Sequence, residues 1–106
     1  MAKAAFRRKD EAFYETVLQL ATTEEAILFF KDLCSSTEIS AIEQRFEVAR
    51  LLCKGAVYVD IAKATGASSA TISRVNRFLN EGTGEFREIF DRYLAANAAG
   101  EAEKEA

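Results

Sequence analysis

The side chains best suited to chemistry form a short polar series between positions 69 and 77. If the apolar residues Ile72, Val75 and Leu79 point inward at helical spacing, the opposite side presents small and basic residues: Ser69, Ala70, Ser73, Arg74 and Arg77. Serine can donate or accept a hydrogen bond at a base edge, alanine can contact a thymine methyl, and arginine can bind guanine through two hydrogen bonds. This chemistry is recognition of double-stranded DNA through a groove.

Contacts to phosphate are expected beside these residues. Ser68 is a natural N-cap, so the helix that follows would start with free N–H groups and the positive end of its dipole. Lys63, Thr71 and Asn76 are further expected phosphate contacts at the flanks. For Arg74 and Arg77 the alternative is a surface salt bridge, for example between Arg77 and Glu81 four residues later.

This chain lacks the residue types that common enzyme active sites and metal sites need. The sequence has no histidine, which excludes Ser-His-Asp and Cys-His catalysis and histidine-ligated zinc. The carboxylates are scattered, the five glycines form no phosphate-binding loop, and Cys34 and Cys53 lack metal-ligand or CxxC spacing, so we interpret them as buried thiols. We therefore expect a binding protein with no enzymatic activity, no metal and no cofactor.

Length and composition indicate one small globular domain. The chain has 106 residues, of which 49% are hydrophobic. It has neither an apolar run long enough for a membrane span nor an apolar signal-peptide core, so we expect a cytoplasmic protein with no membrane contact. We assign residues 1–97 to a single helical domain. Residues 98–106 alternate alanine with charge, and we expect them to form a flexible acidic tail.

The apolar residues recur with a helical period along almost the whole chain, which predicts an all-α fold of six helices. Thr22 with Glu25, and Ser35 with Glu38, are capping boxes that should start two of them. The first helix is expected from about Ala5 to Leu20, the second is opened by Thr22 and carries Ile27, Phe30, Leu33 and Cys34, and the longest is started by Ser35, carries a stripe of Ile39, Ile42, Phe46, Ala49 and Cys53, and ends at Gly55. The other three are expected at about Val59 to Thr65, Ser69 to Asn80 and Glu85 to Asn97.

The two short helices match the spacing of a helix-turn-helix from Tyr58 to Leu79. Such a hairpin needs a small residue where its helices cross, a glycine in the turn and apolar residues that lock the second helix onto the first. Ala62, Gly66 and Ile72 occupy the small, turn and locking positions, and Ile61 and Val75 add further apolar contacts. The alternative is a plain helical hairpin within a core.

Charge is concentrated around this hairpin. The whole chain carries a net charge of −3, but residues 45–80 hold six basic residues against Glu47 and Asp60. The segments before and after are both acidic, so 45–80 is the one basic zone. We expect DNA binding of modest affinity and strong salt dependence, because few phosphates are neutralised per chain.

The helices outside the hairpin carry more apolar surface than a chain of this size can easily cover. Phe29 beside Phe30, and Val48 and Leu51 beside the main stripe of the longest helix, widen their apolar faces. This excess favours a second chain as a partner. A thick core in a monomer is the alternative.

A family resemblance extends from about Ser35 to Leu94. It is carried by Ile39-Ser-Ala-Ile-Glu-Gln-Arg-Phe-Glu-Val-Ala-Arg-Leu-Leu52, by Lys54-Gly55 and by Gly66-Ala-Ser-Ser-Ala-Thr-Ile-Ser-Arg74. These segments resemble the Trp repressor superfamily, and within it the TrpR-related YerC/YecD family. The resemblance implies an intertwined homodimer, with recognition helices in successive major grooves about 34 to 36 Å apart and a palindromic operator.

The same resemblance allows the corepressor pocket of the Trp repressor to be compared position by position. Arg45 and Arg74 fall on the two arginines that flank the amino acid there, so Arg45, Arg74 and Phe78 form the candidate ligand pocket. However, Val75 stands in place of a glycine and Phe78 in place of a serine that helps to hold the ligand. Both changes add bulk and remove polarity, so we expect no amino-acid corepressor.

The sequence thus favours a sequence-specific transcriptional regulator, a homodimeric repressor that reads a palindromic operator. The alternative is a helix-turn-helix protein-interaction module without specific DNA readout, in which the basic zone contacts acidic side chains of a protein partner.

Overall fold

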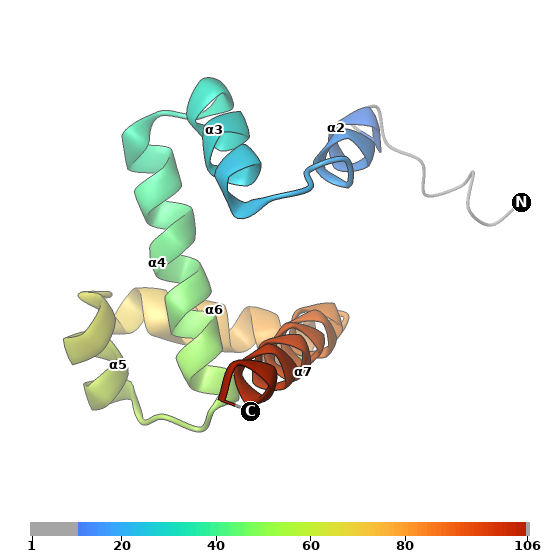
Figure 1. The fold of residues 1–106 in the computed structure, drawn as a ribbon. Helices are drawn as coiled ribbons and strands as arrows, with labels where there is room; N and C mark the ends of the chain where they lie inside the picture. The colour runs from blue at the N-terminus through green and yellow to red at the C-terminus, as the bar shows by residue number, and fades with distance from the viewer. Residues whose placement is uncertain (1–10, 106) are drawn as a thin grey trace, which may run out of the picture. The chain divides into compact units, whose positions relative to one another are not determined.

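The computed structural model describes residues 11–105 of the backbone and the side chains of residues 11–98. This part of the chain contains six helices and no strand, as predicted. They are α2 (Glu11–Val17), α3 (Thr23–Leu33), α4 (Ser36–Cys53), α5 (Tyr58–Thr65), α6 (Ser69–Glu81) and α7 (Glu85–Glu105), shown in Figure 1. They group into two compact units, one ending at Ile39 and one starting at Ser40. The assignment of residues 1–97 to a single domain stays a prediction.

Both predicted capping boxes start a helix. At α3 the backbone N–H of Glu25 donates to Thr22 Oγ1 over 3.0 Å, while the Glu25 carboxylate accepts from Ala21, one residue before the expected donor. At α4 both bonds form as expected: Glu38 N–H donates to Ser35 Oγ over 3.2 Å, and Ser35 N–H donates to Glu38 Oε1 over 2.9 Å. Hydrogen bonding to the Glu38 carboxylate from the Ser35 backbone N–H, and to a lesser extent from the Ser35 side chain, lowers the pKa of Glu38.

The first expected helix is shorter than predicted at its C-terminal end. Residues 5–10 lie outside the described part of the chain, and α2 ends at Val17, not at Leu20. After Val17 the chain tightens, because the N–H of Gln19 donates to Thr16 and the N–H of Leu20 donates to Val17, each to a carbonyl three residues back. These shorter loops end the α-helical hydrogen-bond pattern.

The last helix is longer than predicted. It continues beyond Asn97 to Glu105, so α7, with 21 residues, is longer than α4, with 18. The expectation that α4 is the longest helix and the expected end at Asn97 are both corrected. Alanine and glutamate dominate residues 98–105, and their high intrinsic helix propensity favours continuation of the helix. That residues 98–106 form a flexible tail stays a prediction.

The core of the second unit joins one helix to the hairpin. Val48 of α4, Ile61 of α5 and Ile72 of α6 have no exposed surface, and Val75 is 3% exposed. Partly buried residues surround them: Leu51, Leu52, Ala56, Ala62, Leu79 and Phe86. In Figure 1 the C-terminal end of α4 accordingly lies among α5, α6 and α7. Burial of a side chain of this size contributes about 1.5–3 kcal/mol, so these contacts hold the hairpin on α4.

Only part of the predicted stripe forms the inward side of α4. Ala49 of that stripe is buried, but Ile42 and Phe46 are 61% and 44% exposed in the single chain, whereas Val48, expected beside the stripe, is fully buried. Both sets of residues have helical spacing, so α4 is apolar on two sides. The position of α5 and α6 decides which side becomes core.

The turn between α5 and α6 depends on Gly66. Its φ is 72° and its ψ 6°, in the left-handed region, and its N–H donates to the Ala62 carbonyl over 2.9 Å. A left-handed backbone is costly for residues with a Cβ. The prediction that Gly66 is the turn residue of the helix-turn-helix is confirmed.

We expect Gly66→Ala to lower the free energy of unfolding by about 1–2 kcal/mol, the cost of a left-handed alanine. A Cβ at this position meets no atom within 4 Å, so the loss comes from backbone conformation alone. Urea denaturation measures it. Gly66→Asn is the matched control, because asparagine tolerates this conformation. Equal losses in the two variants would contradict this explanation.

Candidate nucleic-acid interface

Helices α5 and α6 form the predicted helix-turn-helix, and buried apolar side chains hold the two helices together. Ile61 of α5 and Ile72 and Val75 of α6 are buried in one cluster. Its other members are Val48 and Ala49 of α4 and Ala67 of the turn. Ala62, at the position where a small residue was expected, is partly buried against it. Because these apolar residues point inward, the opposite side of α6 faces solvent.

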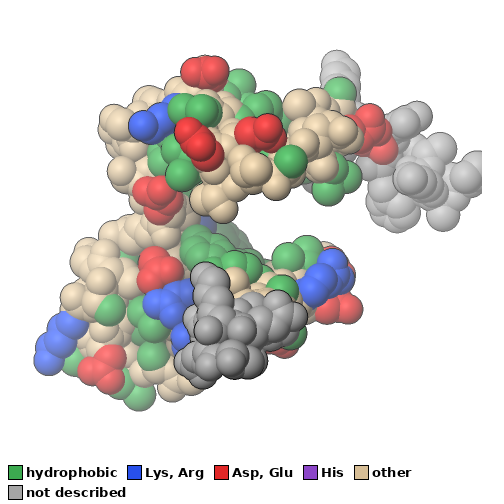
Figure 2. All heavy atoms as spheres, in the orientation of Figure 1, with side chains coloured by type: hydrophobic (Ala, Val, Ile, Leu, Met, Phe, Trp, Pro, Cys, Tyr) green, Lys and Arg blue, Asp and Glu red, His purple; other side chains and the backbone are tan. Residues whose placement is uncertain are grey.

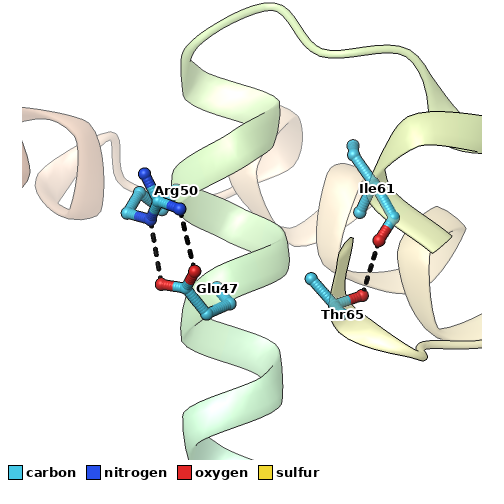
Figure 3. A network of polar contacts seen from close by, with 4 residues as sticks. All are labelled: Glu47, Arg50, Ile61 and Thr65. Atoms are coloured by element: carbon cyan, nitrogen blue, oxygen red, sulfur yellow. Dashed lines mark hydrogen bonds and ion pairs between the residues drawn. The ribbon is translucent and has the colours of Figure 1, made fainter. Parts of the chain in front are cut away.

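Hydrogen bonds around Thr65 fix the turn to α4. The Thr65 hydroxyl donates to the Ile61 carbonyl over 2.8 Å (Figure 3) and accepts from the N–H of Ala67 over 3.1 Å. Gln44 Nε2 of α4 donates to the Thr65 carbonyl over 3.1 Å. Sequence reasoning missed Gln44. The available signal was its place four residues before Val48, which puts both side chains on one side of α4.

The predicted reading residues lie together on the solvent side of α6. Ser69, Ala70, Ser73, Arg74 and Arg77 are all exposed. Lys63 is exposed on α5, and Figure 2 shows basic side chains at the edge of the molecule where α5 lies. The exposed side of α6 therefore presents small side chains and two arginines, and α5 adds an exposed lysine. We call Ser69, Ala70, Ser73, Arg74 and Arg77 the reading face.

Ser68 and Thr71 act together at the start of α6. Ser68 is the N-cap, and its Oγ accepts from the Thr71 N–H over 3.2 Å and donates to Thr71 Oγ1 over 3.1 Å. Thr71 is half-buried, so its hydroxyl is less accessible than those of Ser69 and Ser73. The predicted cap is confirmed. The phosphate contacts assigned to Ser68 and Thr71 stay predictions.

One of the six cations in the basic zone is neutralised within the chain. Arg50 donates to both carboxylate oxygens of Glu47, through Nε over 2.9 Å and Nη2 over 2.8 Å (Figure 3). The hydrogen bond from Arg50 lowers the pKa of Glu47, and the bond to Glu47 raises the pKa of Arg50. Neither Arg74 nor Arg77 forms an ion pair with a described side chain, so the alternative Arg77–Glu81 salt bridge is not formed. The positive charge of the reading face is therefore available to a ligand.

The candidate ligand pocket is open in the single chain. Arg45 and Arg74 are exposed and Phe78 is 51% exposed, whereas Val75 belongs to the buried core. A shallow hollow does lie beside Phe78, but its other lining residues are Leu79, Thr83, Gly84, Phe86 and Arg87. Of the three candidate residues, Phe78 is the one that lines this hollow. The pocket and the expected absence of an amino-acid corepressor stay predictions.

Comparison with known proteins identifies the family. The family model "Trp repressor protein" matches residues 9–94. The chain belongs to the Trp repressor family. It is 45% identical over 82 residues to the YerC protein of Bacillus subtilis (strain 168), covering 77% of this chain and 79% of that protein, which makes it a YerC homologue.

Solved structures show the same fold. A TrpR-like protein from Eubacterium eligens superimposes with a TM-score of 0.78 at 43% identity, covering 86% of this chain and 94% of that one. A Staphylococcus aureus protein gives the same TM-score at 37% identity, with 88% and 94% covered. The fold is therefore all-α and Trp repressor-like, and membership of this family indicates a DNA-binding regulator with a helix-turn-helix, not an enzyme.

The described residues contain neither a membrane-spanning helix nor a metal-binding cluster. None of their helices is long and apolar enough to cross a membrane. They also contain no group of three or more acidic or cysteine side chains arranged to hold a metal ion.

Because its hydroxyl caps α6, Ser68→Ala should lower the free energy of unfolding by about 1 kcal/mol. Ser69→Ala is the matched control, since Ser69 is the next residue, is exposed and makes no side-chain hydrogen bond to a described residue. We expect it to change stability by less than about 0.5 kcal/mol. Urea denaturation compares the two variants, and a similar loss in both would remove Ser68 from the capping role.

Proposed function

We propose that this chain is a sequence-specific DNA-binding regulator that works as a homodimeric repressor and reads a palindromic operator through α6. The observation that carries the proposal is the division of α6 into two sides. Ile72 and Val75 anchor the helix in the core, and Arg74 stands without an ion pair to a described side chain on the exposed side. A protein of this kind works on DNA in the cytoplasm.

The chemistry of the reading face suits the major groove. Ser69, Ala70 and Ser73 are short enough to let α6 approach the bases closely, and Arg74, one turn after Ala70, is long enough to reach guanine. N-terminal residues of a recognition helix are those that contact base edges. We therefore assign base reading to the first two turns of α6 and phosphate contacts to Lys63 and the start of the helix.

The exposed apolar surface of the second unit supports a second copy of the chain as partner. On α7, Ile89 and Tyr93 are 52% and 57% exposed, and on α4, Ile42 and Phe46 are similarly open. The Phe46 ring links the two helices, since its centroid lies 5.8 Å from that of Phe86 on α7. Figure 2 shows hydrophobic side chains at the surface of this unit. Exposed large apolar side chains on neighbouring helices are typical of an interface. We name Ile42, Phe46, Ile89 and Tyr93 the α4–α7 apolar face.

Selection from random DNA duplexes tests the proposal directly. The purified full-length protein should enrich one palindrome from a pool of random duplexes, because two copies related by a two-fold axis read the same half-site twice. A pool that stays random even at low salt, where phosphate contacts are strongest, would leave the helix-turn-helix as a protein-interaction module.

Variants of Arg74 and Lys63 should separate base reading from phosphate binding. Arg74→Ala should reduce discrimination between the selected palindrome and random duplex by about 1–3 kcal/mol per half-site. Lys63→Ala should weaken binding to both duplexes alike and lower the slope of log K against log salt by about 0.9 for each phosphate that Lys63 neutralises in the wild type. Fluorescence anisotropy at several salt concentrations measures both effects.

Lys31→Ala is the control for charge, because Lys31 is exposed on α3, outside the basic zone. It should leave both the affinity and the discrimination unchanged. If Arg74→Ala retains full discrimination, Arg74 does not read bases.

The dimer is tested by placing a charge on the α4–α7 apolar face. Wild-type protein should sediment at twice the 11.7 kDa chain mass, and Ile89→Asp should shift it toward the monomer because a buried unpaired carboxylate is costly. Val59→Asp is the matched control, since Val59 is 63% exposed but lies on α5. Sedimentation equilibrium measures the masses. A dimer that survives Ile89→Asp would exclude this face as the interface.

A further inference from the structure

The guanidinium of Arg77 lies over the ring of its neighbour Phe78. Its Cζ atom is 5.6 Å from the ring centroid, within the distance of about 6 Å at which a cation is attracted to an aromatic face. Glu81, four residues further along α6, forms no ion pair with Arg77. Among the contacts described, the Phe78 ring is therefore the group that restrains the Arg77 side chain.

Phe78 makes this contact from outside the core. Its side chain is 51% exposed, while Ile72 and Val75 of the same helix are buried and Leu79 is half-buried. A large ring that stays half in solvent keeps a face open to a cation. Phe78 is thus available to orient a neighbouring side chain, and packing of α6 onto α5 relies on other residues.

The position of Arg77 along α6 indicates which part of DNA it meets. At about 1.5 Å per residue, Arg77 lies about 12 Å along the helix axis from Ser69, the first residue of α6. The major groove is about 12 Å wide. If the first turns of α6 contact base edges, a side chain in the third turn reaches the wall of the groove, where the phosphates lie.

We propose that Arg77 binds a DNA phosphate and that Phe78 is a positioning residue that holds its guanidinium in place for this contact. This inference rests on the proposed DNA-binding function and divides the two arginines of the reading face, with Arg74 reading bases and Arg77 binding the backbone. An arginine that is already ordered loses less side-chain entropy on binding.

A double-mutant cycle on a random-sequence duplex tests the proposal. The full-length wild type, Arg77→Ala, Phe78→Leu, the double variant and Phe78→Tyr are compared by fluorescence anisotropy across a salt series. Phe78→Leu should weaken binding about two- to fivefold, as removal of an exposed cation–π interaction implies, and Phe78→Tyr should bind like wild type. In the Arg77→Ala background, Phe78→Leu should have no further effect. Arg77→Ala should lower the salt slope by about 0.9.

Other results would overturn the proposal. If Phe78→Leu weakens binding equally with and without Arg77, Phe78 acts through packing. If Arg77→Ala changes the ratio of affinities for the selected palindrome and the random duplex, Arg77 reads bases. If Phe78→Leu unfolds, Phe78→Tyr still tests the proposal. Weaker DNA binding by a folded Phe78→Tyr variant would contradict positioning of Arg77 by the ring.

The choice of duplex separates this proposal from the function on which it rests. The cycle needs no operator, so failure to select a palindrome would overturn sequence-specific regulation and leave the coupling between Arg77 and Phe78 measurable. Absence of all DNA binding at low salt would overturn both.

Discussion

Burial of Val48, Ile61 and Ile72 against one another is the interaction on which the rest of the structure depends. These three side chains come from α4, α5 and α6, and none has exposed surface. Because α5 has only eight residues and α6 thirteen, neither would be stable as an isolated helix in water. Contact with α4 therefore supplies the stability of the hairpin, and it fixes which residues of α6 can meet a ligand.

This burial divides α6 into residues that stabilise the fold and residues that stay exposed for contact with a ligand. Residues that hold the helix are apolar and inward, and residues available for DNA are short or basic and outward. Ser68 serves structure at the boundary, where its hydroxyl caps the helix. The Glu47–Arg50 pair is a similar case, since it removes one cation from the apparent basic zone. The count of six basic residues against Glu47 and Asp60 already includes both members of this pair, so the pair leaves the net charge of residues 45–80 unchanged and only fixes where the positive charge lies.

The α4–α7 apolar face is apolar surface that a single chain leaves exposed. Phe46, Phe86 and Phe90 form a ring cluster between α4 and α7, with Phe90 only 4% exposed, yet Ile89 and Tyr93 on the same helix remain open. A helix with apolar residues on two sides needs two partners. On one side the helix packs against the rest of its own unit. For the other side, we propose that a second copy of the chain is the partner.

Local sequence by itself determined the helix starts at Thr22 and Ser35, the turn at Gly66 and the inward residues of the hairpin. Capping bonds, a left-handed turn and helical periodicity each involve residues only a few positions apart. Tertiary structure decided which side of α4 is buried and which group Gln44 binds, the carbonyl of Thr65 on another helix. Both outcomes depend on where distant helices pack, which spacing along one helix does not specify.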